Sequence, residues 1–196
     1  MSNPDLLARA AEPLLRLVPT VSADQLGGPT PCSAWDVRAL VDHLLRWAPA
    51  LEAAGRRTTA PAHHDQIDDL PPGAWADELA ARVRRTVDAW SRPDAWEGST
   101  ALDGFTLPAS VVGGMLVGEL VVHGWDLARA TGHEPGWDDD VLTYLHGEVA
   151  YSARTGREMG VYGPERTVPG SATVLDRTLA LTGRDPAWSP TAAWTS

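Results

Sequence analysis

Glu119 and His123 are the residues whose type and position first indicate chemistry. They lie four residues apart in the most apolar stretch of the chain, which runs from Val111 to His123. Residues at this spacing project from one face of a helix, and a helix that is apolar on all sides is normally buried. We therefore expect Glu119 to lie inside the protein, where a carboxylate is tolerated only if it is paired, hydrogen-bonded or bound to a metal. His123, one turn away, could share that metal.

His43 is the best third ligand among the remaining histidines. It lies beside Leu40 and Leu44 on a predicted helix, whereas the others lie in a polar loop, beyond a helix end or on another helix, namely His63, His64, His133 and His146. Two imidazoles and one carboxylate suit a catalytic zinc ion, which uses three protein ligands and keeps a position open for water or substrate. The three residues therefore predict an open metal site.

The sequence predicts the ligands more firmly than it predicts which metal they bind. The same donors also suit non-haem Fe(II), and Ni or Mn could compete for them. We expect zinc, because nothing in the sequence indicates redox chemistry. The competing interpretation is structural: Glu119 and His123 form an ordinary helical pair, and His43 is a solvated or core histidine. The Glu-x-x-x-His spacing alone favours the structural interpretation, and the apolar surroundings together with His43 bring the two interpretations level.

Asp126 and Cys32 are secondary candidates near the predicted ligands. Asp126 lies one turn beyond His123, where its carboxylate could orient the imidazole or reach a neighbouring helix, and it could equally pair with Arg129. Cys32 lies 11 residues before His43 and could supply a fourth, thiolate ligand if the loop folded back. Its default role is that of a small buried hydrophobe near the start of a helix.

Three tryptophans lie close in sequence to the predicted ligands. Trp35 and Trp47 flank His43, and Trp125 follows His123 by two residues. Their indole rings could line a ligand pocket, although core packing is the commoner use of tryptophan at helical spacing. The sequence contains no glycine-rich phosphate loop, Gly-x-Ser-x-Gly motif or paired-cysteine zinc motif. The metal site is therefore its strongest functional signal.

Helices with apolar stripes must position these residues. Capping residues and apolar spacing predict helices over about residues 4–18, from 33 to before 55, and over 75–90, 108–132, 138–153 and 174–181. Pro13 should kink the first helix or mark a break in it. Ser33 and Asp36 form a variant capping box at the start of the second helix. The third helix has a second face that carries Arg82, Arg84 and Arg85, opposite its apolar stripe.

The remaining segments are predicted as connections. Residues 22–31 and 55–73 have no amphipathic period, and residues 92–107 form a connection that could include a short extended piece. Strand-like alternation is otherwise almost absent. The fold class is therefore all-α: a four-helix bundle with one or two extra short helices near the C-terminus, in a single domain covering residues 1–196. Bundles of this kind often hold metals between facing helices.

Composition narrows the classes of partner. The 196 residues carry a net charge of −10, which opposes an electrostatic grip on nucleic acid or on anionic lipid. No signal peptide is recognisable, and no apolar run reaches the roughly 18 residues of a membrane span. Cys32 is the only cysteine, which fits a reducing compartment. We therefore expect a cytoplasmic protein that binds neither nucleic acid nor membrane.

Three segments together resemble a known family, the actinobacterial DinB-like metal-binding proteins. Its nearest named members are the metal-binding domains of mycothiol-dependent maleylpyruvate isomerases. The segments are Pro29 to Leu44, Glu119 to Gly132, and Asp176-Arg177 with Gly183-Arg184-Asp185-Pro186. The resemblance covers essentially the whole chain, and the run His-Gly-Trp-Asp-Leu-Ala-Arg-Ala-Thr-Gly is its most specific part.

The resemblance implies a DinB-like four-helix bundle in which His43, Glu119 and His123 hold a divalent metal. Related enzymes use the metal to activate the thiol of mycothiol or bacillithiol for isomerisation or S-transfer, because coordination lowers the pKa of a thiol. In the isomerases a further C-terminal domain contributes to the active site. This chain stops soon after Asp185-Pro186, so we do not expect maleylpyruvate isomerisation itself.

The leading hypothesis is thus a metal-dependent S-transferase or isomerase that acts on a small molecule, with mycothiol as a co-substrate. One alternative is a lyase, cyclase or hydrolase that uses the metal without a thiol. Another is a non-catalytic module that binds a metal or a small molecule, for which a closed shell of four ligands would be evidence. A homodimer is one option for its assembly.

Overall fold

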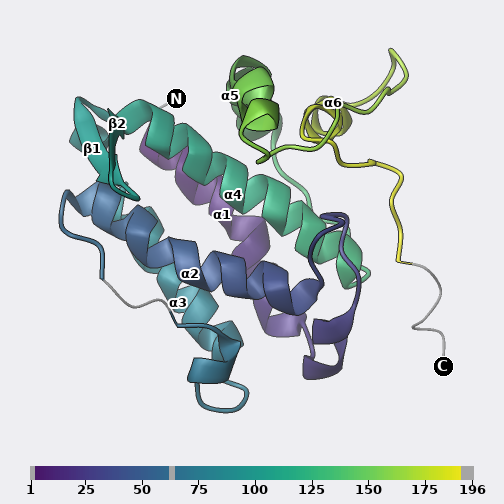
Figure 1. Ribbon diagram of the computed structural model, residues 1–196, viewed down its shortest axis with the longest axis horizontal. Helices are drawn as coiled ribbons and strands as arrows, with labels where there is room; N and C mark the ends of the chain where they lie inside the picture. Colours follow the sequence, from purple (N-terminus) through teal and green to yellow (C-terminus); the bar gives the residue numbers. More distant parts are fainter. Residues whose placement is uncertain (1–2, 62–64, 191–196) are drawn as a thin grey trace.

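Four helices form a bundle in the computed structural model, which describes residues 3–61 and 65–190 (Figure 1). They are α1 (Asn3–Leu17), α2 (Val37–Arg56), α3 (Trp75–Ala89) and α4 (Ala109–Ala130). α2 packs against α3 and α4, and α1 packs against the same two helices from the other side. His63 and His64 lie outside the described residues. The predicted all-α bundle is confirmed, and the helix bounds differ by only a few residues from those predicted for α1, α3 and α4.

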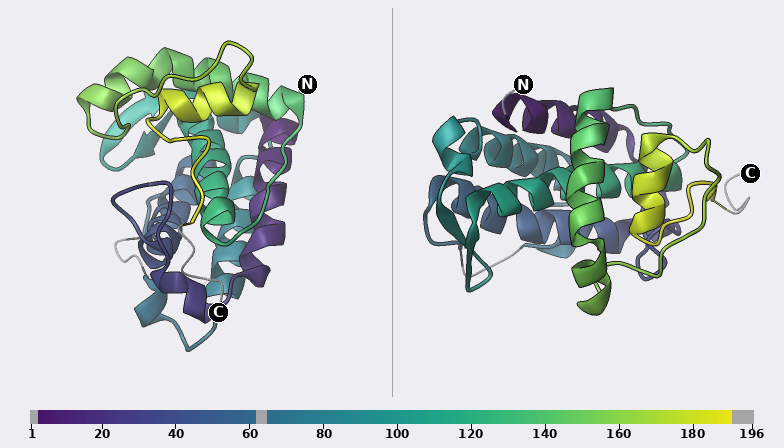
Figure 2. Two further views of the ribbon diagram at one scale, coloured as in Figure 1. Left: turned by 90° about the vertical axis from the view of Figure 1, so that its right-hand side faces the viewer. Right: turned by 90° about the horizontal axis from the view of Figure 1, so that it is seen from above.

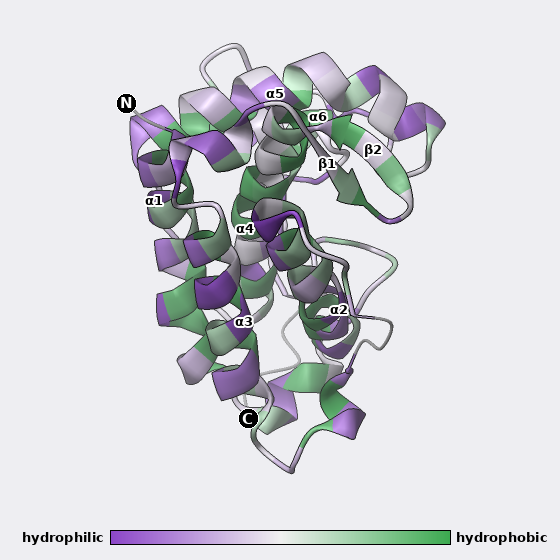
Figure 3. Ribbon diagram, turned by 90° about the vertical axis from the view of Figure 1, so that its left-hand side faces the viewer, coloured by the Kyte–Doolittle hydropathy of each residue, from purple (hydrophilic) through white to green (hydrophobic). Residues whose placement is uncertain are grey.

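The core of the bundle consists of the apolar stripes seen in the sequence. Leu7, Leu14, Leu40, Leu45 and Leu79 are fully buried between the helices. Figure 3 shows hydrophilic and hydrophobic residues alternating around the turns of α1 and α3, as expected for helices with one face in solvent. Each fully buried leucine contributes roughly 1.5–3 kcal/mol relative to an exposed one. Apolar burial therefore holds the helices of the bundle together.

The start of α2 differs from the prediction. The helix begins at Val37, and Asp36 is its N-cap, accepting a hydrogen bond from the Ala39 amide at 2.8 Å. The predicted start at Ser33 is wrong because the preceding loop has hydrogen bonds of its own. The Thr30 hydroxyl donates to the Trp35 carbonyl at 2.8 Å, and the Trp35 amide donates to the Cys32 carbonyl. This loop fixes the indole of Trp35 ahead of the helix.

Two features of α1 and α4 bear on the sequence expectations. α1 continues through Pro13 without a break. α4 is long and apolar enough to cross a membrane by length and composition, contrary to the expectation that no segment qualifies. However, 78% of its most apolar stretch is buried, which is what the central helix of a bundle requires.

The connection between α3 and α4 contains a hairpin of two antiparallel strands, β1 (Ser99–Leu102) and β2 (Phe105–Pro108). The sequence indicated only a short extended piece here. The tight turn uses Asp103 and Gly104, both with positive φ, which is the turn chemistry that an Asp-Gly pair favours. The hydroxyl of Thr100 donates to the Ala54 carbonyl, so the hairpin is fastened to the end of α2.

α5 (Asp139–Glu158) and α6 (Val174–Leu181) lie across the bundle instead of continuing it. Figure 2 shows α5 running nearly perpendicular to the four main helices, with α6 beside it. α5 extends five residues beyond its predicted end at Ala153, whereas α6 has the predicted bounds. α5 packs against α1, α4 and α6. α5 and α6 therefore cover one side of the bundle.

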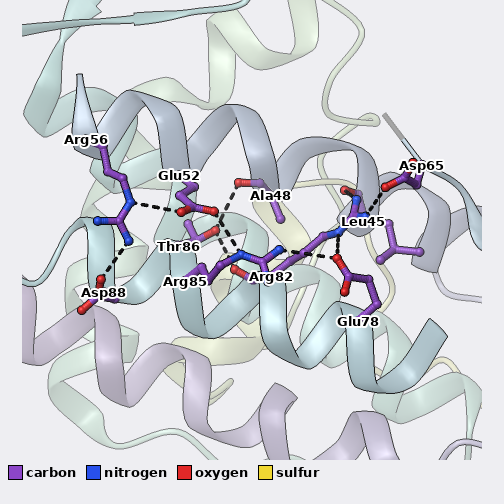
Figure 4. A network of polar contacts seen from close by, with 10 residues as sticks. All are labelled: Leu45, Ala48, Glu52, Arg56, Asp65, Glu78, Arg82, Arg85, Thr86 and Asp88. Carbon is purple, nitrogen blue, oxygen red and sulfur yellow. Dashed lines mark hydrogen bonds and ion pairs between the residues drawn. The ribbon is translucent and has the colours of Figure 1, made fainter. Parts of the chain in front are cut away.

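Arg82 is buried, in contrast to its predicted position on the polar face of α3. Its side chain spans α2 and α3 and donates to the Leu45 carbonyl at 2.9 Å, Glu78 at 2.6 Å and Asp65 at 2.5 Å (Figure 4). Only 5% of the residue is exposed. The prediction failed because helical spacing does not show where a long guanidinium side chain finds acceptors on a neighbouring helix.

Candidate metal centre

His43, Glu119 and His123 converge between α2 and α4. The Nε2 atom of His43 lies 2.8 Å from Oε2 of Glu119, and Nε2 of His123 lies 3.6 Å from the same oxygen. One ligand atom from each of the three residues lies within 4.8 Å of the other two. Nitrogen and oxygen donors around one tetrahedral zinc ion are roughly 3.4 Å apart, given bonds of about 2.0–2.1 Å. The donor types and spacing therefore fit one divalent ion.

Glu119 is less buried than the sequence predicts, with 31% of its side chain exposed. The long apolar run of α4 led to that prediction. The structure shows that α4 is not buried on all sides: Met115 and Val111, one and two turns before Glu119 on the same face, are 49% and 41% exposed. Glu119 therefore lies at the edge of the bundle core, where an incoming molecule can reach its carboxylate.

The two histidines shape the ionisation of Glu119. Burial of the carboxylate disfavours its charged form, but electrostatic interaction with the His123 imidazole and the hydrogen bond from His43 outweigh burial, so the pKa of Glu119 lies below its usual range. An ionised carboxylate is also the form that binds a metal. The negative charge of Glu119 therefore favours binding of a cation at this site.

Asp126 fixes the orientation of His123 from behind. Its Oδ2 atom lies 2.9 Å from Nδ1 of His123, and Asp126 is fully buried. Because a carboxylate only accepts hydrogen bonds, this contact places the proton on Nδ1 and leaves the lone pair of Nε2 directed toward Glu119. A carboxylate behind a histidine is the usual support for a ligating imidazole.

Arg184 completes this support, and the sequence analysis did not identify it as a residue of the site. Its Nε atom donates to both oxygens of Asp126 at 2.9 and 3.0 Å, and its Nη2 atom donates to Oδ2 at 2.7 Å. Burial disfavours the charged form of Asp126, but the charge of Arg184 and the hydrogen bonds from His123 and Arg184 hold the pKa of Asp126 below its usual range. The pairing of Asp126 with Arg129 is wrong: Arg129 instead binds the Trp188 carbonyl and Glu134.

The end of α6 delivers Arg184 to this position. Gly183 has φ of +87°, and a Cβ atom there would come within 2.7 Å of Gly163. The amide of Arg184 donates to the Leu179 carbonyl, and the amide of Gly163 donates to the Thr182 carbonyl. This left-handed glycine ends the helix and turns the next residue into the core. The sequence signal was Gly183-Arg184-Asp185-Pro186, whose glycine and proline are typical of a helix end.

The three tryptophans near the site have different positions. The ring of Trp35 lies 4.6 Å from that of His43 and 5.4 Å from that of His123, so it covers both imidazoles. The ring of Trp47 lies 6.4 Å from His43. Trp125 is 4% exposed and packs in the apolar core. Trp35 and Trp47 therefore border the three donors, and Trp125 supports the bundle.

Cys32 and the other described histidines lie outside the donor group. Cys32 is not among the atoms within 4.8 Å of one another, and burial raises the pKa of its thiol although the charge of Arg184 opposes this. His133 contacts Thr20 and Thr131, and His146 contacts Thr178. Among the residues that the structure describes, three donors thus meet at this point.

Residues 7–128 match the family model of the mycothiol maleylpyruvate isomerase N-terminal domain. The chain belongs to this family. Two uncharacterized proteins from two strains of Mycobacterium tuberculosis are 30% identical to it over 137 residues, which is 68% of this chain and 69% of each relative.

Solved structures show the same fold. The crystal structure of the mycothiol-dependent maleylpyruvate isomerase aligns with a TM-score of 0.57 and 21% identity, covering 79% of this chain and 71% of the other. A histidine-to-alanine mutant of that enzyme gives the same TM-score and coverage at 20% identity. The DinB-like helical fold implied by the sequence resemblance is therefore confirmed.

Proposed function

We propose that this family member is an enzyme that binds one divalent ion, zinc in preference, through His43, Glu119 and His123. The ion would activate a low-molecular-weight thiol of the mycothiol type for S-transfer to, or isomerisation of, a small electrophilic molecule. The observation that carries the proposal is the convergence of three donors from α2 and α4 on a shared point, with His123 oriented by a buried Asp126–Arg184 pair.

Each protein group has a defined task in this proposal. His43, Glu119 and His123 would hold the ion, and its chemistry would be to lower the pKa of a thiol so that the thiol can attack the electrophile. Asp126 keeps the proton of His123 on Nδ1, so that Nε2 is free to ligate. Trp35 shields both imidazoles on one side, which restricts water and keeps the rings in place. The partial exposure of Glu119 leaves a route by which the reactants can approach.

The arrangement favours an open, catalytic site over a structural one. A structural zinc site normally has four protein ligands, and among the described residues Cys32 does not join the three donors. Three ligands leave coordination positions for a thiol or substrate. A reaction without a thiol would use the same open position, so the choice between the two rests on whether turnover depends on thiol concentration.

Metal analysis combined with a thiol-transfer assay tests the proposal. Protein purified without added metal should contain about one ion per chain, and His43→Ala, Glu119→Ala or His123→Ala should lose most of it. His133→Ala is the matched control, because that histidine is exposed and outside the donor group. Zinc-loaded protein should consume an electrophile such as monochlorobimane with a rate that saturates in mycothiol. Unchanged metal content in all three variants would refute the site.

A further inference from the structure

A cavity of about 760 Å³ lies along α2, and its lining begins at Arg46, three residues beyond His43. Its walls are the second half of α2, residues 58–61 and the β1–β2 hairpin, at the end of the bundle where α2 approaches the two strands in Figure 1. This volume is within the range of about 300–1,000 Å³ that is typical of small-molecule sites. The cavity is separate from the three donors, yet it shares α2 with His43.

The cavity has an excess of positive charge, although the chain as a whole is acidic. The chain has a net charge of −10, but the cavity is lined by two arginines, Arg46 and Arg57, against one carboxylate, Asp103. Within residues 3–61 and 65–190, no ion pair with a carboxylate is made by either guanidinium. Their charge is therefore available to a ligand.

Arg57 is held in place by its backbone and its side chain. Its φ of 56° is in the left-handed region, which favours glycine at the end of a helix. Its Nη2 atom donates to the carbonyl of Asp94 at 2.9 Å and to that of Glu97 at 2.5 Å. These acceptors are neutral, so they orient the guanidinium without compensating its charge. A preorganised arginine of this kind suits a carboxylate or phosphate, whose oxygens it can bind in pairs.

The cavity also carries neutral hydrogen-bonding groups and leads toward the metal centre. Thr58, Thr59, Ser99 and Thr106 line it with hydroxyl-bearing side chains. Trp47 lines it as well, and its ring lies 6.4 Å from that of His43. Arg46 is three residues, or about one helical turn, from His43 along α2. One molecule of modest length can therefore reach both the guanidinium of Arg46 and the metal ligands.

We propose that this cavity binds the anionic part of a small organic substrate, a carboxylate or a phosphate, through Arg46 and Arg57. The reacting end of that substrate lies at His43, Glu119 and His123, with Trp47 between the two ends. The position of the reacting end rests on the proposed function, whereas anion binding in the cavity does not depend on a metal.

Amide-detected NMR titrations of EDTA-treated protein test the cavity alone. The probes are succinate, inorganic phosphate, and succinamide as the uncharged counterpart of succinate. Succinate or phosphate should give saturable shifts at the amides of Thr58, Ser99 and Thr106, and succinamide should not. The anion that binds more tightly identifies the group that the cavity accepts.

Variants decide whether the two arginines carry the binding. Arg46→Ala should raise the dissociation constant of the anion at least tenfold. Arg57→Gly should raise it equally, although this substitution also removes the strain of a left-handed backbone conformation. Arg16→Ala, an exposed arginine on α1, is the matched control. Shifts that do not saturate, equal binding of succinamide, or unchanged affinity in Arg46→Ala would overturn the proposal. Loss of metal from the ligand variants tests the proposed function separately, because these titrations contain no metal.

Discussion

Replacing Arg184 by methionine should destabilise the protein strongly while leaving its ligand set intact. Arg184 and Asp126 are 7% and 0% exposed, and three contacts of 2.7–3.0 Å join them. Removing one partner of a buried ion pair costs about 3–5 kcal/mol, because the other charge is left uncompensated. Domains of this size have a total stability of roughly 5–15 kcal/mol. Urea denaturation of metal-free protein should therefore show a large drop in midpoint at an unchanged slope.

The double variant Asp126→Leu/Arg184→Met separates stability from metal binding. Apolar residues in place of both charges should restore most of the lost stability, since a buried ion pair is often replaceable by well-packed hydrophobic side chains. Zinc affinity should nonetheless fall about 10–100-fold, because His123 has lost the acceptor for its Nδ1 proton. Arg184→Met alone retains Asp126 and should lose less zinc affinity than the double variant.

Two outcomes would refute this reasoning. A cost below about 1 kcal/mol for Arg184→Met would mean that the pair contributes no more than a surface ion pair. Wild-type zinc affinity in the double variant, measured by competition with a chromophoric chelator, would mean that Asp126 does not orient His123. Arg154→Met is the control, since its side chain is 88% exposed and surface changes normally stay within about 0.5 kcal/mol.

Three further predictions follow from the same geometry. The pKa of Asp126 is depressed in the fold, so its stabilising contribution is complete above its ordinary pKa of ~4 and is lost as the pH falls through the lower folded value. Thermal melts of metal-free wild type and Asp126→Asn should show the stability difference between them narrowing with acidification over that interval. Gly183→Ala should cost roughly 1–3 kcal/mol and lower metal content, because Gly183 has positive φ and a Cβ there would contact Gly163 at 2.7 Å, whereas Gly136→Ala, which faces open space, should change neither quantity in the same melts and metal analyses. Chelation should lower the melting temperature, by an amount equivalent to about 2.7 kcal/mol when free metal is at 100 times its dissociation constant, yet far-ultraviolet circular dichroism should show the helices intact, since the apolar core is built without the metal.

The bundle was predictable from sequence because its signals are local. α4 follows Pro108 and ends before Gly132, and α6 ends before Gly183, with periodically spaced apolar residues inside both helices. Their observed bounds agree closely with the predicted ones. The start of α2 was misplaced because Ser33 and Asp36 both resemble caps. Only the hydrogen bonds within the preceding loop, such as that from Thr30 to Trp35, decide between them.

The donor group was predictable in part for the same reason. The spacing of Glu119 and His123 places both on one face of α4, whereas the approach of His43 depends on the packing of α2 against α4, a tertiary contact. The role of Arg184 could not be predicted, because 58 residues separate it from Asp126. The sequence around it, Gly183 to Pro186, indicates a helix end but does not indicate a partner for the guanidinium. Contacts across such separations depend on how α5 and α6 cross the bundle, which no periodicity encodes.

The contact between Arg184 and Asp126 also bears on the biosynthesis of the protein. A nascent chain that has emerged from the ribosome as far as α4 already carries all three donors. Its Asp126 then faces a forming apolar core with no counter-charge, because Arg184 is synthesised 58 residues later. Stable metal uptake should therefore follow release of the completed chain, and a product truncated before Gly183 should retain the ligands but bind zinc weakly.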